Sequence, residues 1–255
     1  MKIIIKYILL DLIRNKTILV YTCLLAAISI SILSTGGNTS KGLLSLLNIT
    51  LLFVPIISIL FATIYFFNST EFTELLLAHP IRRRSMLMAE YTAVAFALSI
   101  AYLIGFGIPL LVLGTGNAAV ILIISGIFLT LIFTALSILI FVLFRDKTKG
   151  IGASIIIALF FTLLFDGLLL SFIYSFSEYP IDTAILGFIS LNPVDLARIL
   201  VLLQLDVAVM MGYSGALFKK FLGSETGSIY SIICMLLWIT IPIFVSLKMF
   251  KKKDL

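Results

Sequence analysis

The chain has 255 residues, of which 62% are hydrophobic and only 12% are charged. Soluble domains carry about 25% charged residues, so this composition excludes a soluble globular protein and indicates a membrane protein. The formal net charge of +6 would suit a nucleic-acid partner, but the basic residues occur in short clusters between apolar runs. That pattern is typical of membrane orientation and argues against nucleic acid.

Cysteine and histidine usage excludes several kinds of site. Cys23 and Cys234 both lie in apolar runs, so we expect them to be hydrophobic packing residues. His79 is the only histidine, which excludes a histidine-based metal site or catalytic triad within this chain. No G-x-x-x-x-G-K-[ST] loop occurs, so the chain cannot hydrolyse ATP in the manner of a P-loop enzyme.

The first segment, residues 1–16, combines four basic residues with many Ile and Leu. This composition predicts an amphipathic helix that lies in the headgroup layer of the membrane. A cleavable signal peptide is the alternative. It is less favoured because the basic residues spread along the whole segment and no A-x-A site follows.

Six charge-poor runs are long enough to cross a hydrocarbon core of about 30 Å. We expect membrane lipids to surround them. They are residues 17–34, 43–67, 86–113, 118–144, 151–176 and 229–247. Asp166 lies near the middle of the fifth run, where a carboxyl group must pair, face water or stay protonated, so it is a candidate functional residue. Glu90 lies in the third run within a turn or two of the arginines at 82–84, which favours a structural role.

The segment between the second and third runs, residues 68–85, is short, polar and rich in leucine. Asn68 is placed to cap a helix that Pro80 ends. The apolar residues of this helix follow i, i+3, i+4 spacing and form a ridge outside the bilayer. They are Phe72, Leu75 and Leu76. A solvated loop followed by a stop-transfer charge cluster is the alternative.

Residues 177–228 are more polar than the rest of the chain. Asn192 as cap, Pro193 at the first position and Asp195 in the first turn predict the start of a helix. The apolar run 194–211 is long enough to cross the membrane, but it carries three charged residues on one face of a helix, a face that would be unfavourable against lipid. These residues are Asp195, Arg198 and Asp206.

The distribution of basic residues decides between six and seven spans. Fourteen of the 18 Lys and Arg residues occur in four clusters: four within 1–16, three at 82–84, three within 145–149 and four within 248–253. A seventh span would place the last cluster on the opposite side from the others. The positive-inside rule therefore selects six spans with both termini in the cytoplasm, and 177–228 becomes an outer re-entrant or interfacial pair of helices.

The sequence TELLLAHPIRRR, residues 73–84, resembles the segment that follows the second span in ABC-2 type transporter permeases. The resemblance implies a cytoplasmic coupling helix that fits a cleft of a separate ATPase subunit. The residues implied in this contact are Glu71, Phe72, Glu74, Leu75, Leu76 and His79. It also implies a homodimer in the bacterial inner membrane, with ATP and Mg²⁺ held by the ATPase and no cofactor in this chain.

The order of segments also resembles these permeases, over one transmembrane domain at 1–255. The resemblance implies an all-α membrane protein of six transmembrane helices. To these it adds an N-terminal interfacial helix, a coupling helix after span two and outer re-entrant helices between spans five and six.

The sequence ISLNPVDLAR, residues 189–198, resembles a stretch of one subgroup, which serves the maturation of nitrous oxide reductase. In that subgroup a periplasmic protein of copper-site assembly docks on the outer side, which implies Asp195, Arg198 and Asp206 as docking residues. A general ABC-2 exporter of a lipid, drug or other small molecule is the alternative. A secondary transporter or membrane scaffold is less favoured, because secondary transporters more often carry several charges at mid-depth.

Met210 and Met211 would be soft ligands for copper. Adjacent residues of a helix point about 100° apart, and no third soft ligand lies near them in the sequence. We therefore expect both to be packing residues and predict no metal site in this chain.

Overall fold

The computed structural model describes residues 2–34, 39–77, 82–113, 116–176, 182–204 and 212–250. All elements within these ranges are helical, and none of them is a strand. The first seven are α1 (Lys2–Ile13), α2 (Lys16–Ser34), α3 (Thr39–Asn68), α4 (Thr70–Leu77), α5 (Arg83–Tyr102), the π-helix η1 (Leu103–Gly107) and α6 (Ile108–Leu113). The remaining seven are α7 (Asn117–Leu143), α8 (Lys147–Leu159), the π-helix η2 (Phe160–Leu164), α9 (Phe165–Ser175), α10 (Asp182–Ser190), α11 (Pro193–Leu202) and α12 (Gly212–Phe250).

Six helical stretches in the described residues are long and apolar enough to cross a membrane. They are Lys16–Ser34, Lys41–Asn68, Arg83–Leu113, Asn117–Leu143, Lys147–Ser175 and Glu225–Phe250. Each overlaps one of the six runs predicted from the sequence. The prediction of an all-α membrane protein is therefore confirmed for the described residues, with six single helices able to cross a membrane and one bent pair, Ala184–Ser190 and Pro193–Leu202, that would make a seventh span if it crossed as one.

Two helix boundaries differ from the predictions. The last helix begins at Gly212, so its first part overlaps the region 177–228 that the sequence places outside the spans. Asn68 does not cap a new helix, because α3 continues to this residue and the Oδ1 atom of Asn68 accepts a hydrogen bond from Lys147 Nζ at 2.6 Å. The end of α3 is held in helical form because Phe66 and Phe67 both pack against Phe141 of α7.

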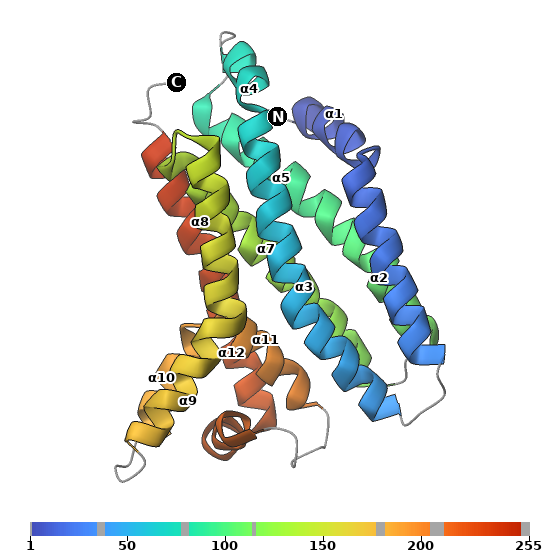
Figure 1. Cartoon of the computed structure of the whole chain (residues 1–255), viewed down its shortest axis with the longest axis vertical. Coiled ribbons are helices and arrows are strands. Elements are labelled where there is room, and N and C mark those ends of the chain that lie inside the picture. The colour runs from blue at the N-terminus through green and yellow to red at the C-terminus, as the bar shows by residue number, and fades with distance from the viewer. Residues whose placement is uncertain are drawn as a thin grey trace.

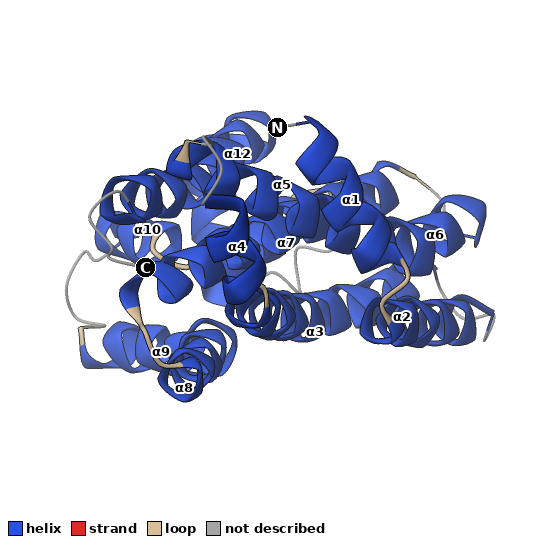
Figure 2. Cartoon of the chain, turned by 90° about the horizontal axis from the view of Figure 1, so that it is seen from above, coloured by secondary structure: helices blue, strands red, loops and turns tan. Residues whose placement is uncertain are grey.

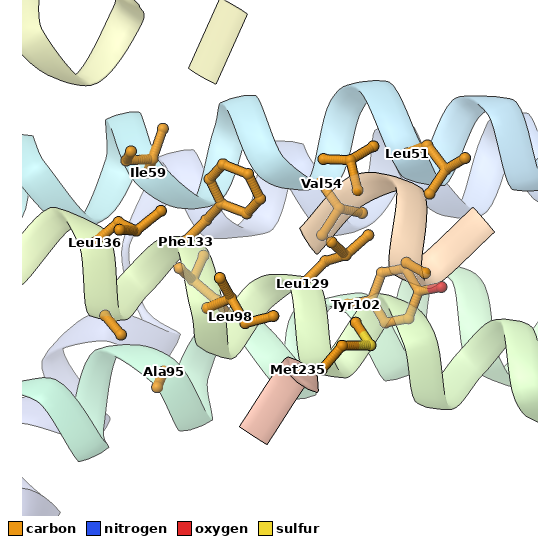
Figure 3. Packing of buried hydrophobic residues seen from close by; sticks show 14 of the residues in the cluster. Leu51, Val54, Ile59, Ala95, Leu98, Tyr102, Leu129, Phe133, Leu136 and Met235 are labelled. Carbon is orange, nitrogen blue, oxygen red and sulfur yellow. The ribbon is translucent and has the colours of Figure 1, made fainter. Parts of the chain in front are cut away.

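Helix α7 lies at the centre of the bundle (Figure 2) and contacts α3, α5, α11 and α12. Tyr102 of α5 lies against the backbone of α7, where a Cβ atom added at Gly126 would stand 2.2 Å from its ring. The Tyr102 hydroxyl donates to Leu122 O at 3.3 Å. Figure 3 shows the core in which these helices meet, with Leu51, Val54 and Ile59 of α3, Ala95 and Leu98 of α5, Leu129, Phe133 and Leu136 of α7, and Met235 of α12.

The π-helix η1 ends two residues before Pro109. Pro109 has no N–H group, so the carbonyl of Gly105 four residues earlier lacks its α-helical donor. The hydroxyl of Ser29 on α2 donates to Gly105 O at 3.0 Å instead. This hydrogen bond joins η1, in the third long helix, to α2.

Short helices occupy the two ends of the bundle (Figure 1). At one end lie α4, α1 and the end of α12, and at the other lie α9, α10 and α11. We call these the α4 end and the α11 end. The stretches Ala184–Ser190 and Pro193–Leu202 are bent by 107° relative to each other. Asn192 caps α11, with its Oδ1 accepting from Val194 N at 3.0 Å, and Pro193 begins the helix, so the predicted helix start is confirmed.

Candidate functional site

The first candidate site is the exposed face of α4, an eight-residue helix. Phe72 is 47% exposed and Leu75 is 70% exposed, whereas Leu76 is half-buried. Large apolar side chains exposed together on a short helix form a surface that a protein partner would cover. Glu71 is also exposed, while the side chain of Glu74 and all of His79 lie outside the part of the chain that the structure describes.

The opposite face of α4 is attached to the third long helix by a hydrogen bond. Thr73 is buried, and its Oγ1 lies within hydrogen-bonding distance of Glu90 Oε1 on α5 and 2.9 Å from Ser69 O. A hydroxyl has one hydrogen, so these two acceptors compete for it. Glu90 is 0% exposed, and its Oε2 has no hydrogen-bond partner among the described residues.

The second candidate site is a charged cluster at the α11 end. Arg198 lies between two carboxylates, with its Nη2 2.9 Å from Asp166 Oδ2 on α9 and its Nη1 3.0 Å from Asp195 Oδ1 one turn earlier on α11. Asp195 is nearly buried, while Asp166 and Arg198 each keep 34% of their side-chain surface exposed. Asp166 therefore pairs, which is one of the three outcomes expected for a carboxyl group at this depth.

Asn192 extends this cluster to the backbone of the fifth long helix. Its amide nitrogen donates to Asp195 Oδ2 at 2.9 Å and to Phe161 O at 3.2 Å, one hydrogen for each acceptor. Phe161 lies in the π-helix η2, a kind of turn that is rare and frequent at functional sites. The start of α11 is thus bonded both to the charged cluster and to the wide turn of the fifth long helix.

The last long helix is connected to the same place. Trp238 Nε1 donates to Ser190 O at 3.2 Å, at the end of α10, and the Ser190 and Tyr230 hydroxyls are 2.8 Å apart. The Trp238 ring also packs edge-on against Phe161, with ring centres 5.3 Å apart. Helices α9, α10, α11 and α12 therefore meet through polar contacts at one level of the bundle.

The structure brings together some of the residues predicted for the sites and leaves others untested. Asp195 and Arg198 lie together, and their role in docking stays a prediction. Asp206, Met210 and Met211 lie outside the described residues. Within the described part of the chain, no three His, Cys, Asp or Glu side chains are grouped so that they could hold a metal ion.

Sequence reasoning missed Thr73, Asn192 as a donor, and the pairing of Asp166 with Arg198. The i, i+3 spacing of Asn192, Asp195 and Arg198 is a local signal that predicts a shared face. Nothing in the sequence relates Thr73 to Glu90 or Asp166 to Arg198.

Comparison with known proteins agrees with this architecture. The family described as "ABC-2 family transporter protein" matches residues 3–255, nearly the whole chain. The chain therefore belongs to the ABC-2 transporter family and is a permease, the transmembrane subunit of an ABC transporter. Membership implies a cytoplasmic ATPase partner.

Among individual proteins, the chain is similar to the probable ABC transporter permease protein NosY of Pseudomonas aeruginosa. The two are 28% identical over 225 residues, which cover 80% of this chain and 82% of the relative. Both resemblances noted in the sequence, to the family and to this kind of permease, are thereby confirmed.

Proposed function

We propose that this permease works as a homodimer whose ATPase partner docks on α4, and that ATP-driven movement of the ATPase is passed through α4 to the long helices. The exposed apolar pair on α4, Phe72 and Leu75, supports the docking surface. The contact between Thr73 and Glu90 supports the next step, because it joins α4 to α5. In this proposal the α4 end lies in the cytoplasm, together with both termini and the interfacial helix α1.

The docking surface is tested by Leu75→Asp. A charge placed in an apolar contact without a partner costs several kcal/mol, so the ATPase should no longer co-purify with the permease. The control is Leu75→Met, which keeps the apolar contact and should retain the ATPase at equal stoichiometry with the permease. Co-purification of the Asp variant at the normal yield contradicts the docking surface.

For the opposite side of the membrane, we propose a role in copper-site maturation of nitrous oxide reductase. The α11 end supports it, because the NPVDLAR stretch forms a capped helix outside the six long helices. Its Arg198 keeps 34% of its side-chain surface exposed, so a partner could reach it. The similarity to the NosY permease points to the same role. The bent pair α10 and α11 would then be the outer re-entrant helices, set on the fifth and sixth spans.

The maturation role is tested by deletion of this chain in its own organism. Nitrous oxide reductase should still be expressed but should lack its catalytic copper–sulfide centre, as metal analysis and activity measure. Restoration by the normal chain, and not by Leu75→Asp, would connect the phenotype to ATPase coupling. A fully metallated reductase in the deletion strain contradicts this role, and sensitivity to a drug or a change in lipids would then favour a general exporter.

A further inference from the structure

A cavity of about 520 Å³ lies beside α4, between α1 and the end of α3. This volume is in the range of sites that hold a small ligand, and a long side chain is smaller than most such ligands. Phe72, which belongs to the exposed apolar pair on α4, forms part of the cavity wall. The cavity is therefore continuous with the surface proposed for the ATPase, and a protein that covers α4 also covers the cavity.

The wall of the cavity combines aromatic rings with a single kind of charge. Tyr7 of α1, Tyr65 of α3 and Phe72 supply the rings. Asp11 of α1 supplies a carboxylate, and no Lys, Arg or His is found among the lining residues that the structure describes. Aromatic faces and a carboxylate both attract a cation. The cavity is thus suited to a positively charged group.

The carboxylate of Asp11 is available to such a group. Asp11 is exposed and forms no ion pair with any residue in the described ranges. Arg14 lies one turn later on α1, but it does not line the cavity. Of the two long basic side chains, arginine fits better than lysine, because a planar guanidinium can stack on an aromatic ring while it donates two hydrogen bonds to a carboxylate.

We propose that the ATPase subunit inserts an arginine side chain into this cavity. Its guanidinium pairs with Asp11 and lies against the rings of Tyr7 and Phe72. The inference rests on the proposed docking of the ATPase on α4, and it assigns to the same partner a second contact, on α1.

Both contacts lead to the same long helix. Helix α1 packs on α5, and its Ile8 and Leu12 are buried in the core. Helix α4 reaches α5 through the contact between Thr73 and Glu90. An ATPase that holds α1 and α4 together therefore acts on α5 at two points.

The test measures the Kd of the purified ATPase subunit for the full-length permease in nanodiscs, at low and at high salt. Asp11→Asn should weaken binding about fivefold at low salt and reduce the salt dependence, because the variant lacks the charge of the pair. Asp11→Glu keeps the charge and should bind more tightly than Asp11→Asn. The matched control is Glu225→Gln, which changes an exposed acid on α12 outside the cavity and should bind normally. An unchanged Kd and salt dependence in Asp11→Asn, with normal melting, overturns the proposal.

Charge reversal identifies the arginine. Asp11→Arg should abolish stimulation of the ATPase, and each arginine of the ATPase is then changed to Glu in turn. One of these changes should restore stimulation with Asp11→Arg and impair it with the normal permease. Failure of every arginine to do so contradicts the proposed pair.

Leu75→Asp separates this inference from the docking on α4. If Leu75→Asp releases the ATPase while Asp11→Asn binds it normally, the contact on α4 stands and the arginine contact is wrong. If Leu75→Asp still binds the ATPase normally, the docking proposal fails, and this inference fails with it.

Discussion

Asp195 at the α11 end has both carboxylate oxygens engaged, one by Asn192 and one by Arg198, whereas Glu90 at the α4 end has a partner for one oxygen among the described residues. Arg198 in turn binds a second carboxylate, that of Asp166. Thr73, the partner of Glu90, can turn its hydroxyl to Ser69 O and leave the contact. The charged groups at the α11 end thus form one connected network. At the α4 end, the Thr73 hydroxyl has a second acceptor, Ser69 O, to which it can donate in place of Glu90.

The difference indicates where relative movement is easiest. Removing one member of a satisfied buried network leaves charged groups unpaired, which is unfavourable. Breaking the contact between Thr73 and Glu90 leaves the Thr73 hydroxyl bonded to Ser69 O and leaves one buried carboxyl group, that of Glu90, without this partner. We infer that α4 can shift against α5, while α9 and α11 move together. Three substitutions test this contrast, from the largest expected effect to the smallest.

The largest effect is expected from Arg198→Ala. It leaves Asp195 nearly buried beside Asp166, so the two carboxylates lose their shared cation. The free energy of unfolding should fall by about 2–3 kcal/mol, below the range for a fully buried pair because Arg198 is 34% exposed. Thermal unfolding in detergent measures the change. Arg84→Ala, at an exposed position of α5, is the matched control, and equal melting of the two variants contradicts the network.

A smaller effect is expected from Asn192→Ala, which removes the cap of α11 and the bonds to Asp195 and Phe161. We expect a loss of about 1–2 kcal/mol by the same thermal measurement. Asn192→Ser keeps an oxygen that can cap the helix but lacks the amide hydrogens. Its loss should be smaller than that of Ala and still measurable. If Ser melts like the unchanged protein, Asn192 acts only as a cap and does not hold the wide turn in η2.

The smallest effect on stability is expected from Glu90→Leu. This change removes a buried carboxyl group with an unpaired oxygen and leaves Thr73 bonded to Ser69, so stability should change by no more than about 0.5 kcal/mol. Stimulation of the ATPase by the permease should nevertheless fall, because α4 loses its polar contact with α5.

A double-mutant cycle sharpens this result. Thr73→Val in the unchanged background leaves Glu90 without that partner and should cost about 1–2 kcal/mol, and in the Glu90→Leu background it should cost less. Equal costs in the two backgrounds would show that the contact carries no coupling energy.

Much of the architecture follows from short-range information. Six apolar runs predicted the long helices, because a helix that crosses a membrane needs about 20 apolar residues in sequence. Asn192 and Pro193 predicted the start of α11, because capping involves only residues two or three apart. The prediction for Asn68 was wrong because it used only neighbouring residues. Asn68 is suited to capping, but α3 continues to it, and the preceding Phe66 and Phe67 pack on α7.

The partners within each site could not be predicted in this way. Thr73 and Glu90 lie 17 positions apart, and Asn68 and Lys147 lie 79 apart, so packing of whole helices decides these contacts. The predicted last span, 229–247, overlaps the stretch Glu225–Phe250, but the prediction did not include the first part of α12, because charges at Lys219, Lys220 and Glu225 limit where lipid can surround a helix. They do not limit where the helix itself begins.

Helix α7 has the highest mean hydropathy of the six long helices, although 72% of its most apolar stretch is buried in protein, against 17% for Glu225–Phe250. A helix covered by other helices does not need so apolar a surface in the finished bundle. During synthesis the order of events is different, because α11 and α12, which pack on α7, emerge from the ribosome after it. Until they arrive, the side of the newly inserted α7 that α11 and α12 later cover faces lipid, and its apolar surface suits that earlier environment. A polar residue introduced on the side of α7 that α12 covers should therefore impair membrane insertion more than the stability of the assembled permease.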